Sequence, residues 1–278
     1  MRVRIELFAL GLLLTACGGD EPVECESCDT AATQTTGDTN DTALTETSDT
    51  ASTGTTETGT TETGTTDTAT TGTTDTVIPG EFGEISGDCG VFTVDNLSDS
   101  SPWSFQNEID FGEGVFSEEY LSDEGVEILE AGNAGGSSLY SEIQAFEVLR
   151  RCEEASLLKT EGEITYTTSE TSITDLLLEI DALKVGVSVT RAYGWPPEDP
   201  YTTEQAVDLL TKKLEGILES SANVSEEDEW VKQVLHVIAY TPDHSDTVVE
   251  AFGTLDEALR GETILMVTAT EGEDEFLY

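Results

Sequence analysis

The sequence predicts an α/β fold: a mixed central sheet flanked by helices and preceded by a disordered tether. Between residues 135 and 270, apolar residues recur at helical spacing in some stretches and in alternating or β-branched runs in others. A chain that switches between these two periods buries them as layers around one core. The expected order is helix, strand, strand, strand, helix, strand, helix, strand, or αβββαβαβ.

The first helix is expected to start at a serine cap, Ser137 or Ser138, and to run to about Arg151. Its apolar residues follow helical spacing and predict one buried stripe. The stripe comprises Leu139, Ile143, Phe146 and Leu149.

The later elements follow from the same periodicities. They are expected at residues 155–159, 174–180 and 184–191 (strands), 202–220 (helix), 234–240 (strand), 245–259 (helix) and 264–270 (strand). A tight turn at Asp181–Ala182 joins two of the strands into a hairpin. Thr202 and Gln205 form a capping box at the start of the second helix.

Residues 82–134 are less regular and are expected to form an irregular cap on the 135–278 core. Within this cap, a strand is expected near residues 90–94 and a helix near 123–131. The cap and core together form the single globular domain predicted for residues 79–278.

The first 17 residues, MRVRIELFALGLLLTAC, contain two arginines followed by a short apolar run. This run is too short to span a bilayer, so it predicts a signal segment, residues 1–16. Leu14 to Cys17 resembles the bacterial lipobox, which implies cleavage before Cys17 and acylation of that cysteine, with chains such as palmitate. Gly18 after the cysteine implies, by analogy, the outer membrane of a Gram-negative cell envelope. A plain secreted protein is the alternative.

Residues 17–78 are dominated by Thr, Gly, Asp and Glu, with a five-residue period in GTTETGTTETGTTDT. Too few apolar residues are present to offset the entropy of ordering, so this segment is expected to be a disordered tether. Threonine O-glycosylation stays open.

The charge is strongly one-sided: 11 Lys and Arg oppose 58 Asp and Glu, a net charge of -47. Such a surface repels phosphate backbones and anionic head groups. The composition therefore disfavours nucleic acid as a partner and leaves the lipid as the only contact with a membrane.

The five cysteines fall into three groups. Setting aside Cys17, an even number remains, as expected in an oxidising compartment. Cys89 and Cys152 are predicted to form a disulfide. Cys25 and Cys28 either pair with each other or bridge to a partner protein.

The element order, with an acidic residue opening the second strand, resembles the restriction-endonuclease-like PD-(D/E)xK superfamily from about residue 135 to 270. The resemblance implies a site made of Glu142 on the first helix, Asp175 on the second strand and a triplet at Ser188, Val189 and Thr190. In that family the carboxylates hold Mg²⁺, and a lysine of the triplet helps to activate water for phosphodiester hydrolysis. Ser188 and Thr190 are neutral, so the triplet is degenerate.

Glu142 is unusual even when the family resemblance is set aside. It interrupts the apolar stripe of its helix, and a buried carboxylate needs a partner or a polar cavity. The hairpin strands each have one polar face, which carries Asp175, Glu179, Lys184, Ser188 and Thr190. A polar pocket between helix and hairpin is therefore predicted. The alternative is a solvated hairpin face and a salt bridge from Glu142 to Arg150, Arg151 or Arg191.

Three functions are compatible with these patterns. The leading hypothesis is a non-catalytic domain that binds a small ligand or a partner protein near Glu142, Asp175, Ser188, Thr190 and Arg191. The second is a metal-dependent hydrolase with a rearranged centre, in which Glu142, Asp175 and Glu179 hold Mg²⁺ or Mn²⁺. The third is a purely structural envelope protein.

Overall fold

The structure, a computed structural model, describes residues 82–278 except 115, 137, 195 and 198. The predicted signal segment, the tether with Cys17, Cys25 and Cys28, and both domain boundaries lie outside the described residues. Those expectations stay predictions.

The centre of the described domain is a seven-stranded mixed sheet, in the order β1-β2-β7-β6-β5-β4-β3. Strands β2, β7, β6 and β5 are parallel, whereas β1, β4 and β3 pair in antiparallel fashion at the two edges. The strands are β1 (Glu84–Gly87), β2 (Trp103–Asp110), β3 (Ser156–Thr160), β4 (Leu176–Ile180), β5 (Leu183–Ala192), β6 (Lys232–Ala239) and β7 (Ile264–Glu271).

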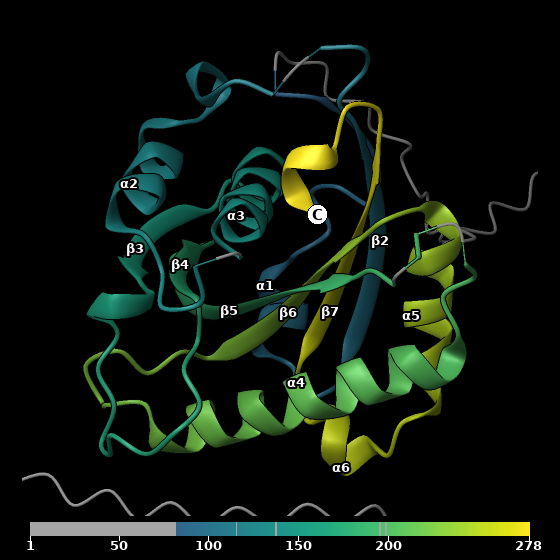
Figure 1. The fold of residues 1–278 in the computed structure, drawn as a ribbon. Helices are drawn as coiled ribbons and strands as arrows, with labels where there is room; N and C mark the ends of the chain where they lie inside the picture. The colour runs from purple at the N-terminus through teal and green to yellow at the C-terminus, as the bar shows by residue number, and fades with distance from the viewer. Residues whose placement is uncertain (1–81, 115, 137, 195, 198) are drawn as a thin grey trace, which may run out of the picture. The chain divides into compact units, whose positions relative to one another are not determined.

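Helices cover both faces of this sheet, so the domain has three layers (Figure 1). They are α1 (Val94–Ser98), α2 (Asp123–Ala131), α3 (Leu139–Glu153), α4 (Thr203–Asn223), α5 (Pro242–Thr254) and α6 (Glu257–Arg260), with 3-10 turns η1 (Glu118–Tyr120), η2 (Glu161–Glu163) and η3 (Glu275–Leu277). Helix α3 packs on one face and α4 with α5 on the other. The α/β class with a mixed sheet is confirmed.

The two apolar layers follow from the alternation along the strands. Val185, Val187 and Val189 of β5 face α3 and join its Ile143 and Phe146. On the opposite side, Ala192 of β5 joins Leu210 and Leu214 of α4 in the second core. Ile143, Phe146 and Leu149 of the predicted α3 stripe are buried and Leu139 is partly buried, but the buried surface of α3 is wider than the stripe and includes every residue from Ser141 to Leu149.

The order αβββαβαβ is confirmed from α3 to β7. Asp181 and Ala182 close the hairpin with φ angles of 50° and 61°, the left-handed geometry that two-residue hairpin turns require. The Thr202–Gln205 capping box is present. The predicted helix 245–259 is instead α5, which begins earlier at Pro242, and the separate short helix α6.

The segment 82–134 differs most from expectation. The predicted strand at 90–94 is wrong, because Thr93 caps the helix α1 and the backbone N–H groups of Gly90, Val91 and Phe92 donate to the Glu153 carboxylate. Helix α2 is confirmed at 123–131. Rather than a loose cap, this segment contributes β1 and β2 to the sheet, and β2 pairs with the distant strand β7.

Cys89 and Cys152 form the predicted disulfide, with their Cα atoms 4.7 Å apart. Beside it, Val148 of α3 packs with Ile85 of β1 and Ile109 of β2 in a third apolar cluster. The bond therefore ties the start of the domain to the end of α3. Within the described part of the chain, no helix is both long and apolar enough to cross a membrane.

Candidate functional site

Three carboxylates meet beside the N-terminal end of β4. One belongs to the first turn of α3, one to the start of η2, and one directly precedes β4. Glu142, Glu161 and Asp175 each place an oxygen within 4.8 Å of the other two. Glu142 is 3% exposed, while Glu161 and Asp175 are half-buried. Two of these three were predicted from the sequence, and Glu161 was not.

Each carboxylate is held by its own local structure. Glu142, in the first turn of α3, accepts hydrogen bonds from the Asn133 amide and from the Ser138 hydroxyl at 3.0 Å. The Ser138 hydroxyl thus donates to Glu142, and its side chain accepts no capping hydrogen bond from the N-terminus of α3. Glu161 begins the turn η2 and accepts from the backbone N–H of Ala134 at 3.2 Å.

Asp175 directly precedes β4, at a place where β5 extends beyond the end of β4. Strand β4 begins at Leu176, opposite Val187, whereas β5 continues to Ala192. Beyond Val187, this edge of β5 pairs with no strand among the residues that the structure describes. Asp175 takes that place, accepting a hydrogen bond of 2.6 Å from the backbone N–H of Val189.

The carboxylates resist ionisation in this surrounding. Burial raises the pKa of Glu142 to about 7, with a further upward contribution from the charge of Asp175; the bonds from Asn133 and Ser138 oppose both. Burial also raises the pKa of Asp175 to about 6, against the opposing charge of Lys213. Near neutral pH the cluster therefore holds closely spaced negative charge that only a cation or a proton relieves.

Lys213 of α4 supplies positive charge beside Asp175. Its ammonium donates to the carbonyl oxygen of Val189 at 2.8 Å, the same residue whose N–H binds Asp175. The degenerate triplet on β5 lacks a lysine, and Lys213 brings one to this edge from a different element. Nothing in the local sequence indicated this, because the contact spans 24 residues and crosses from helix to sheet.

The prediction that a polar pocket lies between α3 and the polar face of the hairpin is wrong, because α3 does not cover that face. Helix α3 packs on the apolar hairpin face, which carries Leu176, Leu178, Val185 and Val187. Glu142 still meets Asp175, because Asp175 precedes β4 and reaches around the strand end.

The other predicted site residues lie outside the carboxylate cluster. Ser188 is on the α4 side, 6% exposed, with its hydroxyl 3.5 Å from the Gln233 amide oxygen. Thr190 is on that same strand face by alternation. Glu179 is exposed and lies opposite Lys184 in the hairpin, so it is not part of the cluster. Arg191 donates to the carbonyl oxygen of Leu277.

The alternative prediction, a salt bridge from Glu142 to Arg150, Arg151 or Arg191, is wrong for the described residues. Arg150 pairs with Glu124 at 3.0 Å and Arg151 pairs with Glu147. Within residues 82–278, as far as described, no ion pair involves Glu142.

The sequence pattern of Thr160 to Glu163 could have indicated where Glu161 lies. Thr160 and Glu163 form a capping box, in which the threonine hydroxyl and backbone N–H both donate to Glu163 at 3.0 Å. This spacing is readable from the sequence and predicts a helical turn that begins with Glu161.

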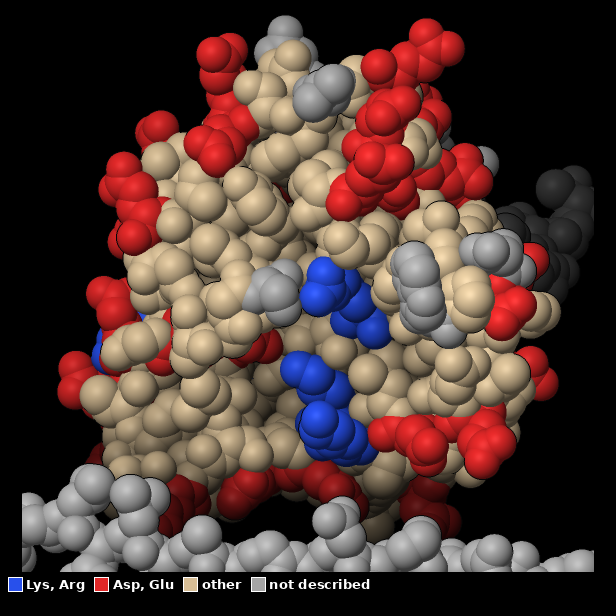
Figure 2. Space-filling view, viewed as in Figure 1, with Lys and Arg blue, Asp and Glu red and all other residues tan. Residues whose placement is uncertain are grey.

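The charges on this face are segregated. Figure 2 shows Lys and Arg side chains as a strip across the middle of the face, where the surface is hollowed, with acidic side chains around its margin. Arg191 and Lys213 belong to the elements that meet there, β5 and α4. The Lys and Arg side chains visible on this face are therefore grouped together, although the chain as a whole is strongly acidic.

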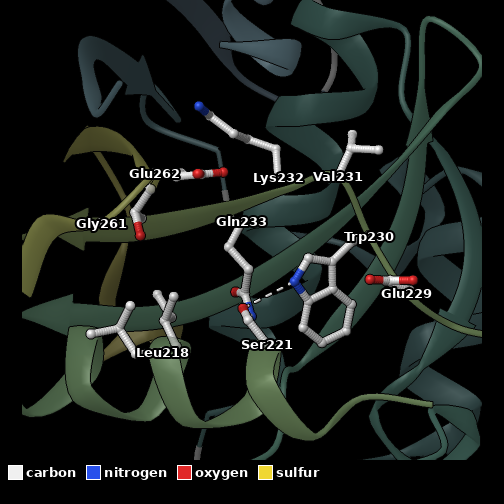
Figure 3. Close-up of a pocket in the computed structure, with 11 residues that line it drawn as sticks. Leu218, Ser221, Glu229, Trp230, Val231, Lys232, Gln233, Gly261 and Glu262 are labelled. Carbon is white, nitrogen blue, oxygen red and sulfur yellow. Dashed lines mark hydrogen bonds between the residues drawn. The ribbon is translucent and has the colours of Figure 1, made fainter. Parts of the chain in front are cut away.

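A pocket separate from the carboxylate cluster, here called the β6–β7 pocket, lies at the opposite ends of the parallel strands, where β6 and β7 begin (Figure 3). It has a volume of about 310 Å³ and mixes apolar walls with two glutamates. Its lining includes Leu218, Ser221, Glu229, Trp230, Val231, Gln233 and Glu262. Its polar floor is Gln233, whose amide donates to the hydroxyls of Thr174 and Ser220 at 3.0 Å.

Comparison with known proteins adds little about this site. No family profile matches the chain. A Dictyostelium discoideum protein, described as AAC-rich mRNA clone AAC4 protein, is 35% identical over 198 residues, 68% of this chain and 26% of the relative. The chain thus spans about a quarter of that relative's length.

Among solved structures, Pyrococcus furiosus SfsA in complex with Ca²⁺ has a TM-score of 0.25 and 14% identity, covering 48% of this chain and 56% of SfsA. That score is below the level of a shared fold, so nothing further rests on it.

Proposed function

We propose that the domain binds a divalent cation through Glu142, Glu161 and Asp175 and hydrolyses a phosphate ester there. The observation that supports this is the convergence of three carboxylate oxygens within 4.8 Å, two of them on groups whose pKa is raised. This is the metal-dependent hydrolase that the sequence offers as an alternative, with Glu161 in the place of Glu179 and Lys213 in the place of the triplet lysine. The likeness to the PD-(D/E)xK superfamily is part of the proposal.

The donor set fits a hard cation. Mg²⁺ and Mn²⁺ prefer carboxylate oxygens, and Mg²⁺ commonly takes one or two protein carboxylates and keeps waters for its other positions. A cation also removes the repulsion that raises the pKa of Glu142 beside Asp175. Asn133 and Ser138 hold the Glu142 carboxylate in orientation.

The residues divide the chemistry between them. A bound cation supplies a Lewis acid that polarises the phosphoryl group and lowers the pKa of water. Lys213, fixed by the carbonyl oxygen of Val189, places a positive charge where an incoming phosphoryl oxygen gains negative charge. Asp175 is oriented by the backbone N–H of Val189, so strand β5 positions both groups.

Metal binding is tested by titration calorimetry with Mn²⁺ at neutral pH. Glu142→Gln and Asp175→Asn each remove one ligand, and we expect affinity to fall at least about tenfold. Glu179→Gln is the matched control, because Glu179 is an exposed glutamate on β4 outside the cluster. Equal affinity in all three variants would sink the metal proposal.

Hydrolysis is tested on the same proteins with an aryl phosphodiester. Lys213→Gln is expected to lower metal-dependent turnover by at least about a hundredfold, while Mn²⁺ affinity changes little. A parallel loss of turnover and metal affinity would instead make Lys213 a structural support of the cluster.

A second candidate is a non-catalytic domain that binds a ligand or partner. One observation favours it: Ser188, at the place of the triplet acid, faces the α4 side and hydrogen bonds with Gln233 rather than facing the cluster. Mn²⁺ binding without turnover on any phosphoester would support this candidate over the hydrolase.

We also propose that the domain is displayed on a lipid anchor at Cys17, in the envelope of a Gram-negative bacterium and at its outer membrane. The support is the resemblance of Leu14–Cys17 to a lipobox and the tether-like composition that follows. Labelling with a palmitate analogue in a bacterial host is expected to mark the wild type and not Cys17→Ser. Equal labelling of both would rule the anchor out.

A further inference from the structure

Three of the nine described Lys and Arg residues form ion pairs, and the cations Arg191 of β5 and Lys213 of α4 are not among them. Arg150, Arg151 and Lys159 each pair with a carboxylate. Among the described residues, Arg191 and Lys213 form no such ion pair; both donate to backbone carbonyl oxygens, of Leu277 and Val189. Their positive charges remain available to an anion.

Both cations lie along the part of β5 that extends beyond β4: Arg191 is a residue of β5, and Lys213 of α4 donates to the carbonyl oxygen of Val189. Val189 and Arg191 are two residues apart, so their side chains and peptide groups face the same ways. Lys213 contacts the peptide of Val189, and Asp175 contacts it from the β4 side. An anion held by Arg191 and Lys213 would therefore lie against the cluster of Glu142, Glu161 and Asp175.

An aromatic wall continues from Arg191 along the same strand direction. The rings of Tyr193, Tyr240 and Tyr278 contact one another, with centroids 4.9 Å to 5.3 Å apart, and all three are half-buried. Burial raises the pKa of Tyr278, and the charge of Arg191 opposes that rise, which places the guanidinium beside this wall. The wall stands at the carboxyl ends of β5 and β6, the edge at which α/β sheets bind ligands.

We propose that the substrate is a small phosphate ester carrying a ring, with its phosphate held by Arg191 and Lys213 and its ring against Tyr193. This inference rests on the proposed function and names its substrate class. A guanidinium and an ammonium are suited to one phosphate group. A tyrosine face offers stacking to a flat ring.

The same charges exclude a long polyanion. Nucleic-acid binding requires many phosphates to be neutralised along a groove. Here the basic strip is confined to the centre of the face and acidic side chains surround it (Figure 2). A polynucleotide that reached the cluster would carry its neighbouring phosphates over those carboxylates.

The test measures binding of phenyl phosphate, inorganic phosphate and a single-stranded oligonucleotide by calorimetry, in chelator and without added metal. We expect phenyl phosphate to bind most tightly, and the oligonucleotide most weakly for equal phosphate concentration. Arg191→Gln is expected to weaken phenyl phosphate and inorganic phosphate alike, by at least about tenfold. Tyr193→Ala is expected to weaken phenyl phosphate alone.

The matched control is Lys184→Gln, a cation on the same strand whose ammonium donates to the carbonyl oxygen of Glu227. Arg191→Lys keeps the charge and serves if Arg191→Gln does not fold. Equal phosphate binding by the control and the Arg191 variants, or tighter binding of the oligonucleotide, would overturn the inference. Mn²⁺ titration of the same variants separates the two proposals, since lost anion binding with intact Mn²⁺ affinity refutes only the substrate class.

Discussion

At the scale of single residues, the carboxylate cluster is a source of instability in the metal-free protein. Glu142 is almost fully buried and faces Asp175, and its two hydrogen bonds do not compensate for lost hydration. Such groups cost folding free energy when ionised. Buried carboxylates with raised pKa values are typical of a functional site rather than of a stabilising one.

The metal-free protein should lose stability as pH rises, through Glu142. Its folded pKa of about 7 exceeds the ordinary value of 4.5, so the folded state binds the proton more tightly than the unfolded state. The stabilisation that this proton gives is fully present at a pH below 4.5, the unfolded-state pKa. It is lost as the pH rises to the folded-state pKa of about 7. Asp175 likewise lowers the stability of the folded state as the pH rises from 3.8 to about 6, the interval between its ordinary and its folded-state pKa.

The measurement is urea unfolding in chelator from about pH 5 to about pH 8, on wild type and Glu142→Gln. The wild type is expected to lose on the order of 2 kcal/mol relative to the variant across this window. Saturating Mn²⁺ should stabilise the wild type above the variant. Parallel pH profiles in chelator would show that Glu142 ionises normally.

At the scale of elements, strand β5 contacts the ring of Trp230 through a glycine. A Cβ atom placed on Gly186 would lie 2.8 Å from the Trp230 ring, closer than real contacts allow. Trp230 is 8% exposed and lines the β6–β7 pocket, with its indole N–H donating to Ser221 at 3.1 Å. The glycine thus lets the indole lie flat on the sheet.

Gly186→Ala is expected to destabilise the domain by about 1 to 3 kcal/mol, because the buried indole must shift. Gly253→Ala in helix α5 is the matched control, since its added methyl group would meet nothing within 4 Å. That control should be neutral or stabilising by about 0.5 kcal/mol. Urea unfolding with tryptophan fluorescence compares them, and equal effects would contradict this packing.

At the scale of the whole molecule, contacts between distant segments complete the sheet. Strand β2 pairs with β7 along its full length, from Trp103 opposite Ile264 to Asp110 opposite Glu271. The disulfide adds a covalent tie between residues separated by 63 positions. Both features join the first described segment to the core that follows it.

Replacing both Cys89 and Cys152 by alanine is expected to lower the free energy of unfolding by about 4 kcal/mol, from the entropy of the released loop. The double variant avoids leaving a free thiol. Calorimetric melting of the oxidised wild type, the reduced wild type and the variant checks this, and the last two should agree. A variant as stable as the oxidised protein would show that β1 and β2 hold without the bond.

The sequence by itself determined the features that depend on local periodicity and spacing. The αβββαβαβ order, the Asp181–Ala182 turn, the Thr202 capping box and the Cys89–Cys152 pair were all predictable, because each is encoded by neighbouring residues or by simple counting. Glu142 could be singled out because a carboxylate interrupts an apolar stripe.

Only the tertiary structure decided which face of the hairpin α3 covers, that β2 joins the sheet, and that Glu161 meets Asp175 while Lys213 binds the peptide of Val189. The physical reason is common to all three. Burial and pairing between distant segments depend on the summed packing of the whole core, which no local pattern records. Because β5 extends beyond β4, the peptide of Val189 binds Asp175 and Lys213 instead of a strand.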